Sequence, residues 1–168
     1  MKKLFQLTFA VALVTLAAAV VNAAPATSTA TVTVNVTVSA TAKLSLGASS
    51  IHFIDADPDV TGSIPQTEPA ITISAKAKTS TGGNVTLTVL SGGDLMSGTD
   101  AITISNITWT VTGAGLAAGT LNKTTAQSVG AWTNSGTWAG TQIYALANSW
   151  AYHTGSYAAT LTYTLTAP

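Results

Sequence analysis

The strongest constraint on this chain is a long run of alternating residues, TATVTVNVTVSATAKLSLG, from Thr29 to Gly47. Side chains of a β-strand point alternately to its two faces, so the run predicts extended backbone. Its Val and Thr residues favour strands because they branch at Cβ. From Val32 onward, one face carries the apolar side chains, which are Val32, Val34, Val36, Val38, Ala40, Ala42, Leu44 and Leu46.

This run is too long for one strand of a small domain. From Thr31 to Leu46 it would span roughly 53 Å at about 3.3 Å per residue, whereas a usual strand has about five or six residues. We therefore predict that residues 24–38 form an N-terminal extension and that Ala40 to Leu46 belong to the domain. The extension is a candidate donor strand, acting through Val32, Val34, Val36 and Val38. The alternative is that the whole run is the first strand of the chain's own sheet.

The same two-residue period continues through the rest of the chain, and no segment shows a convincing helical period. Gly82-Gly83-Asn84 predicts a hairpin turn. A phase slip near Ser105-Asn106 predicts a bulge or a strand that changes sheets. We expect an all-β fold: an immunoglobulin-like β-sandwich of about seven to nine antiparallel strands over residues 39–168, preceded by the N-terminal extension strand.

The first 23 residues, MKKLFQLTFAVALVTLAAAVVNA, have the pattern of a secretory signal peptide. Lys2 and Lys3 precede an apolar stretch from Leu4 to Val21, and small residues offer a cleavage site before Ala24. We predict a protein secreted to a bacterial cell surface or an extracellular fibre, without a membrane segment after cleavage. The alternative is an uncleaved membrane anchor, because the stretch is just long enough to span a bilayer.

Charge is scarce in this sequence. Charged residues make up 7% of it, against an average of about 25% in soluble domains. There is no arginine, and removal of Lys2 and Lys3 leaves four lysines against six acids, a net charge of −2. Nucleic-acid binding needs a basic footprint and is excluded. A surface with so little charge repulsion suits a protein that packs against copies of itself or against a wall.

The residues needed for catalysis are largely missing. The chain has no cysteine, no G-x-S-x-G motif, and only two histidines, His52 and His153. Most nucleophile systems are therefore ruled out. We predict that the protein is not an enzyme.

One acidic segment is a candidate calcium loop, the only cofactor that the sequence indicates. Asp55, Asp57 and Asp59 are spaced like the first ligands of an EF-hand. Val60 stands where the EF-hand turn needs glycine, and Gln66 stands where the bidentate acid belongs. A looser calcium loop would use Asp55, Asp57, Asp59 and Glu68. The alternative is a solvated acidic turn.

Large aromatic residues gather in the later half of the chain. If they are exposed on one face, they can stack on sugar rings; if buried, they belong to the core. The candidate glycan-binding residues are Trp132, Trp138, Trp150 and Tyr152.

The C-terminal sequence GSYAATLTYTLTAP resembles the end of the WxL domain of Gram-positive cell-surface proteins, which closes with a Tyr, then LTWTL, then a terminal Pro. Tyr163 stands where that family has tryptophan. The resemblance implies non-covalent attachment to peptidoglycan. The motif residues are Tyr157, Leu161, Tyr163 and Leu165.

Both ends of the chain also resemble fimbrial subunits that assemble by donor-strand exchange. Those families have a secreted immunoglobulin-like domain, a last strand announced by G-x-Y, and an alternating N-terminal extension. Gly155-Ser156-Tyr157 and Thr31 to Leu46 match this layout. The resemblance implies a partner that is a second copy of the chain.

Three functions remain open at this point. The first is a pilin-like or matrix-fibre subunit that forms filaments or homo-oligomers by β-strand donation. The second is a WxL-type peptidoglycan-binding domain. The third is a carbohydrate-binding module that depends on calcium or on aromatic side chains.

Overall fold

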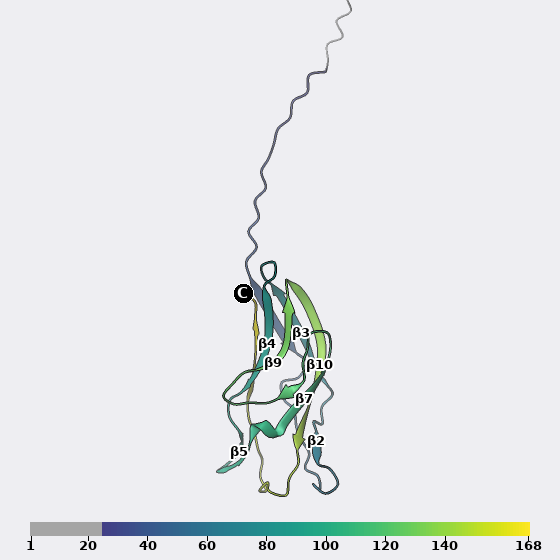
Figure 1. The fold of residues 1–168 in the computed structure, drawn as a ribbon, viewed down its shortest axis with the longest axis vertical. Coiled ribbons are helices and arrows are strands. Elements are labelled where there is room, and N and C mark those ends of the chain that lie inside the picture. The colour runs from purple at the N-terminus through teal and green to yellow at the C-terminus, as the bar shows by residue number, and fades with distance from the viewer. Residues whose placement is uncertain (1–24) are drawn as a thin grey trace, which may run out of the picture. The chain divides into compact units, whose positions relative to one another are not determined.

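The computed structural model describes residues 25–168, so the predicted signal peptide lies outside the described residues. Within them, eleven strands form three antiparallel sheets (Figure 1). The largest sheet has the order β1-β3-β10-β7-β8, with β2 also paired to β10. Its strands are β1 (Thr41–Leu46), β2 (Ser63–Pro65), β3 (Ile71–Lys78), β7 (Ile107–Thr112), β8 (Gly119–Thr120) and β10 (Gly136–Ala147).

The second sheet has the order β11-β4-β9, and a two-stranded ribbon joins β5 to β6. These strands are β4 (Asn84–Ser91), β5 (Leu95–Ser97), β6 (Asp100–Ile102), β9 (Gln127–Thr133) and β11 (Leu161–Thr166). The only helical element in the described part is a single 3-10 turn, η1 (Ile104–Asn106).

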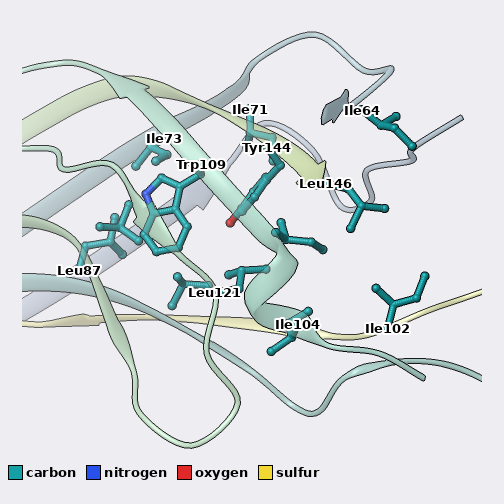
Figure 2. Close-up of a cluster of buried hydrophobic side chains, with 13 residues drawn as sticks. Ile64, Ile71, Ile73, Leu87, Ile102, Ile104, Trp109, Leu121, Tyr144 and Leu146 are labelled. Carbon is teal, nitrogen blue, oxygen red and sulfur yellow. The ribbon is translucent and has the colours of Figure 1, made fainter. Parts of the chain in front are cut away.

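The two larger sheets pack face to face over one apolar core, which confirms the predicted all-β sandwich. Trp109 and Tyr144 from the large sheet meet edge to face, with ring centroids 6.2 Å apart. Leu87 of β4 approaches from the second sheet (Figure 2). Val129 of β9 belongs to the same buried cluster. Alternation along each strand builds this core: in β3 every second residue is buried, from Ile71 to Ala77.

The strand order leaves the immunoglobulin-like subtype unconfirmed. Seven strands have six residues or more. Lettered A to G in chain order, they give sheets A-B-F-D and G-C-E. The immunoglobulin constant-type sandwich has sheets A-B-E-D and C-F-G. The fifth and sixth long strands are therefore exchanged between the sheets.

The predicted hairpin at Gly82-Gly83-Asn84 is wrong. Residues 79–83 do form a turn, in which Gly82 has a φ of 76°. However, β3 pairs with β1 and β10, while β4 pairs with β9 and β11. The turn therefore carries the chain from one sheet to the other, and Asn134 of the neighbouring turn accepts a hydrogen bond from Gly82 N at 2.7 Å.

The predicted change of sheet near Ser105-Asn106 is confirmed. β6 pairs with β5 in the ribbon, η1 follows, and β7 continues in the large sheet. Residues 51–54, by contrast, contribute only one bridge, between Phe53 and Gln66.

The described residues before β1 form no strand. The chain divides between Val36 and Thr37, and residues 25–40 contain no strand. Val32, Val34, Val36 and Val38 are 87%, 81%, 79% and 69% exposed. The long alternating run is therefore used as a strand only from Thr41 onward.

Candidate functional site

One side of the sandwich is closed by short segments. The outer edge of β9 is covered by residues 115–117, because Ala117 N donates to Val129 O and Ala131 N donates to Gly115 O, both at 2.9 Å. Trp109 Nε1 holds the same segment through Ala117 O at 2.8 Å. On the large sheet, β8 pairs with β7. Both sheets are therefore covered on this side.

The opposite side, which we call the open side, is formed by β1 and β11. These two strands lie side by side, and each pairs with only one neighbour among the described residues. Their inward-facing side chains are partly buried against the core: Leu44, Leu46, Leu161, Tyr163 and Leu165. The open side thus presents two unpaired strand edges above apolar side chains, the feature that natural sheets usually cover.

A buried ring of hydrogen bonds lies beneath the open side. Tyr163 OH donates to Gln142 Oε1 at 2.7 Å, Gln142 Nε2 donates to Tyr144 OH at 3.1 Å, and the two tyrosine hydroxyls bond each other. Burial raises the pKa of both Tyr144 and Tyr163 above the ordinary value. The ring ties the edge strand β11 to β10 in the other sheet.

The C-terminal motif faces inward. Leu161, Tyr163 and Leu165 are partly buried, while the threonines between them are exposed. Tyr157 also packs on the core, and its hydroxyl donates to His153 O at 2.9 Å. A wall-binding surface on this strand would therefore use its threonines, and replacement of Tyr163 would test the core instead.

Three of the four predicted calcium ligands, Asp57, Asp59 and Glu68, have other side-chain partners in the described structure. Glu68 pairs with His52, and the hydrogen bond from the His52 ring lowers the pKa of Glu68 to about 2. Asp57 accepts a hydrogen bond from Asp59 N at 2.9 Å and so closes its own turn, while Asp55 is exposed. Among residues 25–168, no three His, Cys, Asp or Glu side chains gather closely enough to hold a metal ion.

The four candidate aromatic residues separate into two pairs at opposite ends of β10. Trp132 and Trp138 stack with centroids 4.8 Å apart, across the inner faces of the two sheets. Beyond the other end of β10, Trp150 is 71% exposed. Tyr152 packs on the core and donates to Ala147 O at 2.7 Å. No single aromatic face unites them.

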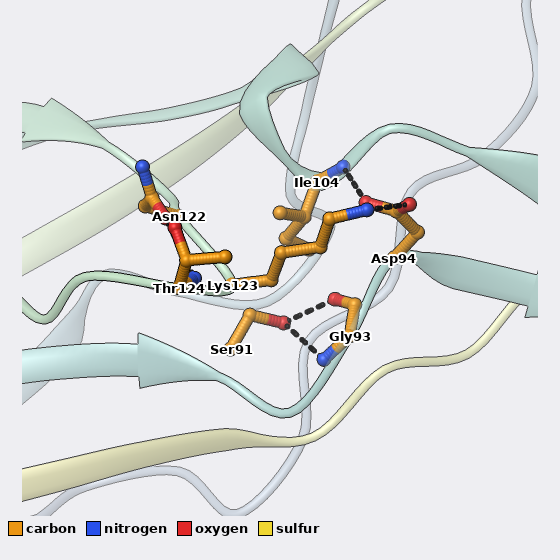
Figure 3. Close-up of polar contacts among 7 residues, drawn as sticks. All are labelled: Ser91, Gly93, Asp94, Ile104, Asn122, Lys123 and Thr124. Carbon is orange, nitrogen blue, oxygen red and sulfur yellow. Dashed lines mark hydrogen bonds and ion pairs between the residues drawn. The ribbon is translucent and has the colours of Figure 1, made fainter.

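A second polar cluster lies where β4 ends (Figure 3). Asp94 accepts hydrogen bonds from Lys123 Nζ at 2.5 Å and from Ile104 N at 3.0 Å. The Lys123 hydrogen bond holds the pKa of Asp94 below its ordinary value. Asn122 Oδ1 accepts from Thr124 N and Thr125 N, and Asn122 O accepts from Ser91 N. This cluster fastens η1 and the 121–125 turn to β4.

Comparison with protein-family models, curated proteins and solved structures gives no match for this chain. Within residues 25–168, no helix has the length and apolar character needed to cross a membrane.

Proposed function

We propose that this chain is a secreted structural subunit of a bacterial cell surface or extracellular fibre, and that it self-assembles by β-strand donation. Residues 24–38 of one copy add as a strand to the open side of the next copy. The observation that carries this proposal is the exposure of Val32, Val34, Val36 and Val38 in a segment with no strand partner.

Strand addition satisfies both partners at once. The donor gains backbone hydrogen bonds along a free edge, and its alternating side chains gain an apolar surface. Burial of four valines at about 1.5 kcal/mol each gives roughly 6 kcal/mol of gross stabilisation. Hydrogen bonds add a modest net amount, and the entropy of ordering the segment opposes both. Because the donor and acceptor surfaces differ, the association propagates as a filament instead of closing into a dimer.

The test is assembly of purified protein that begins at Ala24. Electron microscopy should show fibres for this protein and none after deletion of residues 24–38. A sharper comparison uses two variants, each with two asparagines on one face of the donor strand. The pair Val34→Asn and Val36→Asn should abolish fibres, whereas Thr33→Asn and Thr37→Asn should leave them. Fibres that survive the deletion would end the proposal.

A binding assay on purified peptidoglycan, with the protein that begins at Ala24, distinguishes this function from wall binding of the WxL type. Retention on purified peptidoglycan by protein that forms no fibres would favour the wall-binding domain.

A further inference from the structure

Three of the four lysines after the predicted cleavage site gather on one outer surface, which we call the lysine face. Lys43 in β1 lies directly opposite Lys76 in β3, and Lys78 lies two residues further along β3, opposite Thr41. All three side chains are exposed. A shallow hollow of about 260 Å³ is lined by Lys43, Ser45, Ser74 and Lys76. Two cationic and two hydroxyl side chains make this hollow suited to a carboxylate.

Within residues 25–168, the lysine face has no acidic partner. The ion pairs of the described residues are His52–Glu68, Lys123–Asp94 and His153–Asp100. Like charges directly opposite each other destabilise a sheet, so the Lys43–Lys76 pair opposes folding unless something neutralises it. In a chain with so few charges, this concentration points to an external acidic partner.

An acidic and apolar surface, which we call the acidic tip, lies at the far end of the same domain. It consists of residues 54–60 together with Trp150, whose Nε1 donates to Asp59 Oδ1 at 3.1 Å. Ile54, Val60 and Trp150 are 69%, 82% and 71% exposed. Asp55, Asp57 and Asp59 are exposed among them. Apolar anchors with a polar rim are the usual anatomy of a protein interface.

The two surfaces cannot meet within one molecule. Thr137, near the start of β10, lies opposite Lys76. Past the end of β10, Asn148 Nδ2 donates to Ala56 O at 2.8 Å and so holds the acidic tip. The intervening strand covers roughly 35 Å at about 3.3 Å per residue. In Figure 1, β2 lies beside the end of β10 that leads to the acidic tip. Only a second copy can bring a tip to a lysine face.

We propose that the acidic tip of one copy docks on the lysine face of the next, and that this contact sets the direction of the filament. The inference rests on the proposed function. It adds a charged contact that orients one copy against the next, because residues 24–38 contain no charged side chain. The chain enters β1 at Thr41, opposite Lys78, so the donor segment joins the domain at the lysine-face end. Docking and strand donation therefore use the same pair of ends.

Charge reversal tests the contact through the rate of fibre growth, measured by light scattering at low salt. One variant carries Lys43→Glu, Lys76→Glu and Lys78→Glu. The other carries Asp55→Lys and Asp59→Lys, and keeps Asp57 because its carboxylate closes the turn. Each should elongate at least about tenfold more slowly, since complementary charge acts mainly on association rate. An equimolar mixture should recover elongation to about half the wild-type rate at equal total concentration, because each variant's tip matches the other variant's lysine face and each fibre end accepts only the other variant.

The control adds like charge elsewhere: Thr108→Glu with Thr110→Glu on the exposed face of β7 should leave the rate unchanged. The docking inference is overturned if wild-type fibres require residues 24–38 but both reversal variants grow normally. It is also overturned if the mixture stays as slow as its components. Absence of wild-type fibres overturns the proposed function instead.

Discussion

The hydroxyl of Tyr163 should contribute about 2 kcal/mol to the stability of the sandwich. Tyr163→Phe removes the hydrogen bonds to Gln142 Oε1 and to Tyr144 OH, and it keeps the aromatic side chain that packs on the core. Gln142 is 0% exposed, so its oxygen loses its donor where water cannot replace it. An unsatisfied buried polar group of this kind costs about 1–3 kcal/mol. For a domain of this size, that loss lowers the melting temperature by roughly 6–10 °C.

The assay is urea unfolding followed by tryptophan fluorescence, with the slope of free energy against urea expected to stay constant. Tyr157→Phe is the matched control, because its hydroxyl makes one bond, to His153 O, on an exposed part of the surface. It should cost less than about 1 kcal/mol. If Tyr163→Phe is no more destabilising than Tyr157→Phe, the hydrogen-bond ring does not fasten β11 to the opposite sheet, and the reasoning fails.

Three further predictions follow from the described contacts. Burial raises the pKa of Tyr144 and Tyr163, so the stability that their neutral hydroxyls contribute is complete below the unfolded pKa near 10. Above that pH the free energy of unfolding falls by up to about 1.4 kcal/mol per pH unit for each tyrosine. Urea midpoints between pH 8 and 11 should therefore fall less steeply for Tyr163→Phe than for wild type, and equal slopes would contradict this. Gly140→Ala would place a Cβ 2.2 Å from Thr112 O and should cost at least about 2 kcal/mol, whereas Gly62→Ala, with nothing within 4 Å of its Cβ, should be nearly neutral by the same unfolding assay. His52→Ala should raise the pKa of Glu68 from about 2 toward 4.5, as followed by NMR titration; a pKa that stays low would mean that other groups hold it down.

The alternation of residues predicted the fold class because it reports which side of a strand faces the core. It carries no information on which strand is the neighbour. The turn at Gly82-Gly83 was therefore predicted as a hairpin, although its two strands lie in different sheets. Long-range packing decides that choice, and local turn chemistry is compatible with either outcome.

The hydrogen-bond ring was not predicted, because the hydropathy of residues 142 and 143 in β10 predicts that the isoleucine is buried and the glutamine exposed. Ile143 is 44% exposed, whereas its polar neighbour Gln142 is fully buried. Gln142 is tolerated there because Tyr144 and Tyr163 satisfy its amide. Closeness in sequence did not predict the candidate sites. The structure places Trp132 and Trp138 at one end of β10 and Trp150 at the other, and it pairs Glu68 with His52.

The exchange of strands between sheets has a consequence for the speed of folding. β11 pairs with β4 through contacts such as Leu161 with Ser91, and β10 pairs with β3 through contacts such as Gly136 with Ala77. Each of these two pairings requires a long loop to close, with loss of chain entropy, before any stabilising contact forms. Domains dominated by such non-local pairings fold slowly, in the millisecond-to-second range. During synthesis β4 lacks one neighbour until β11 has been made. The nascent chain therefore stays unfolded, and vulnerable to aggregation, for most of its length.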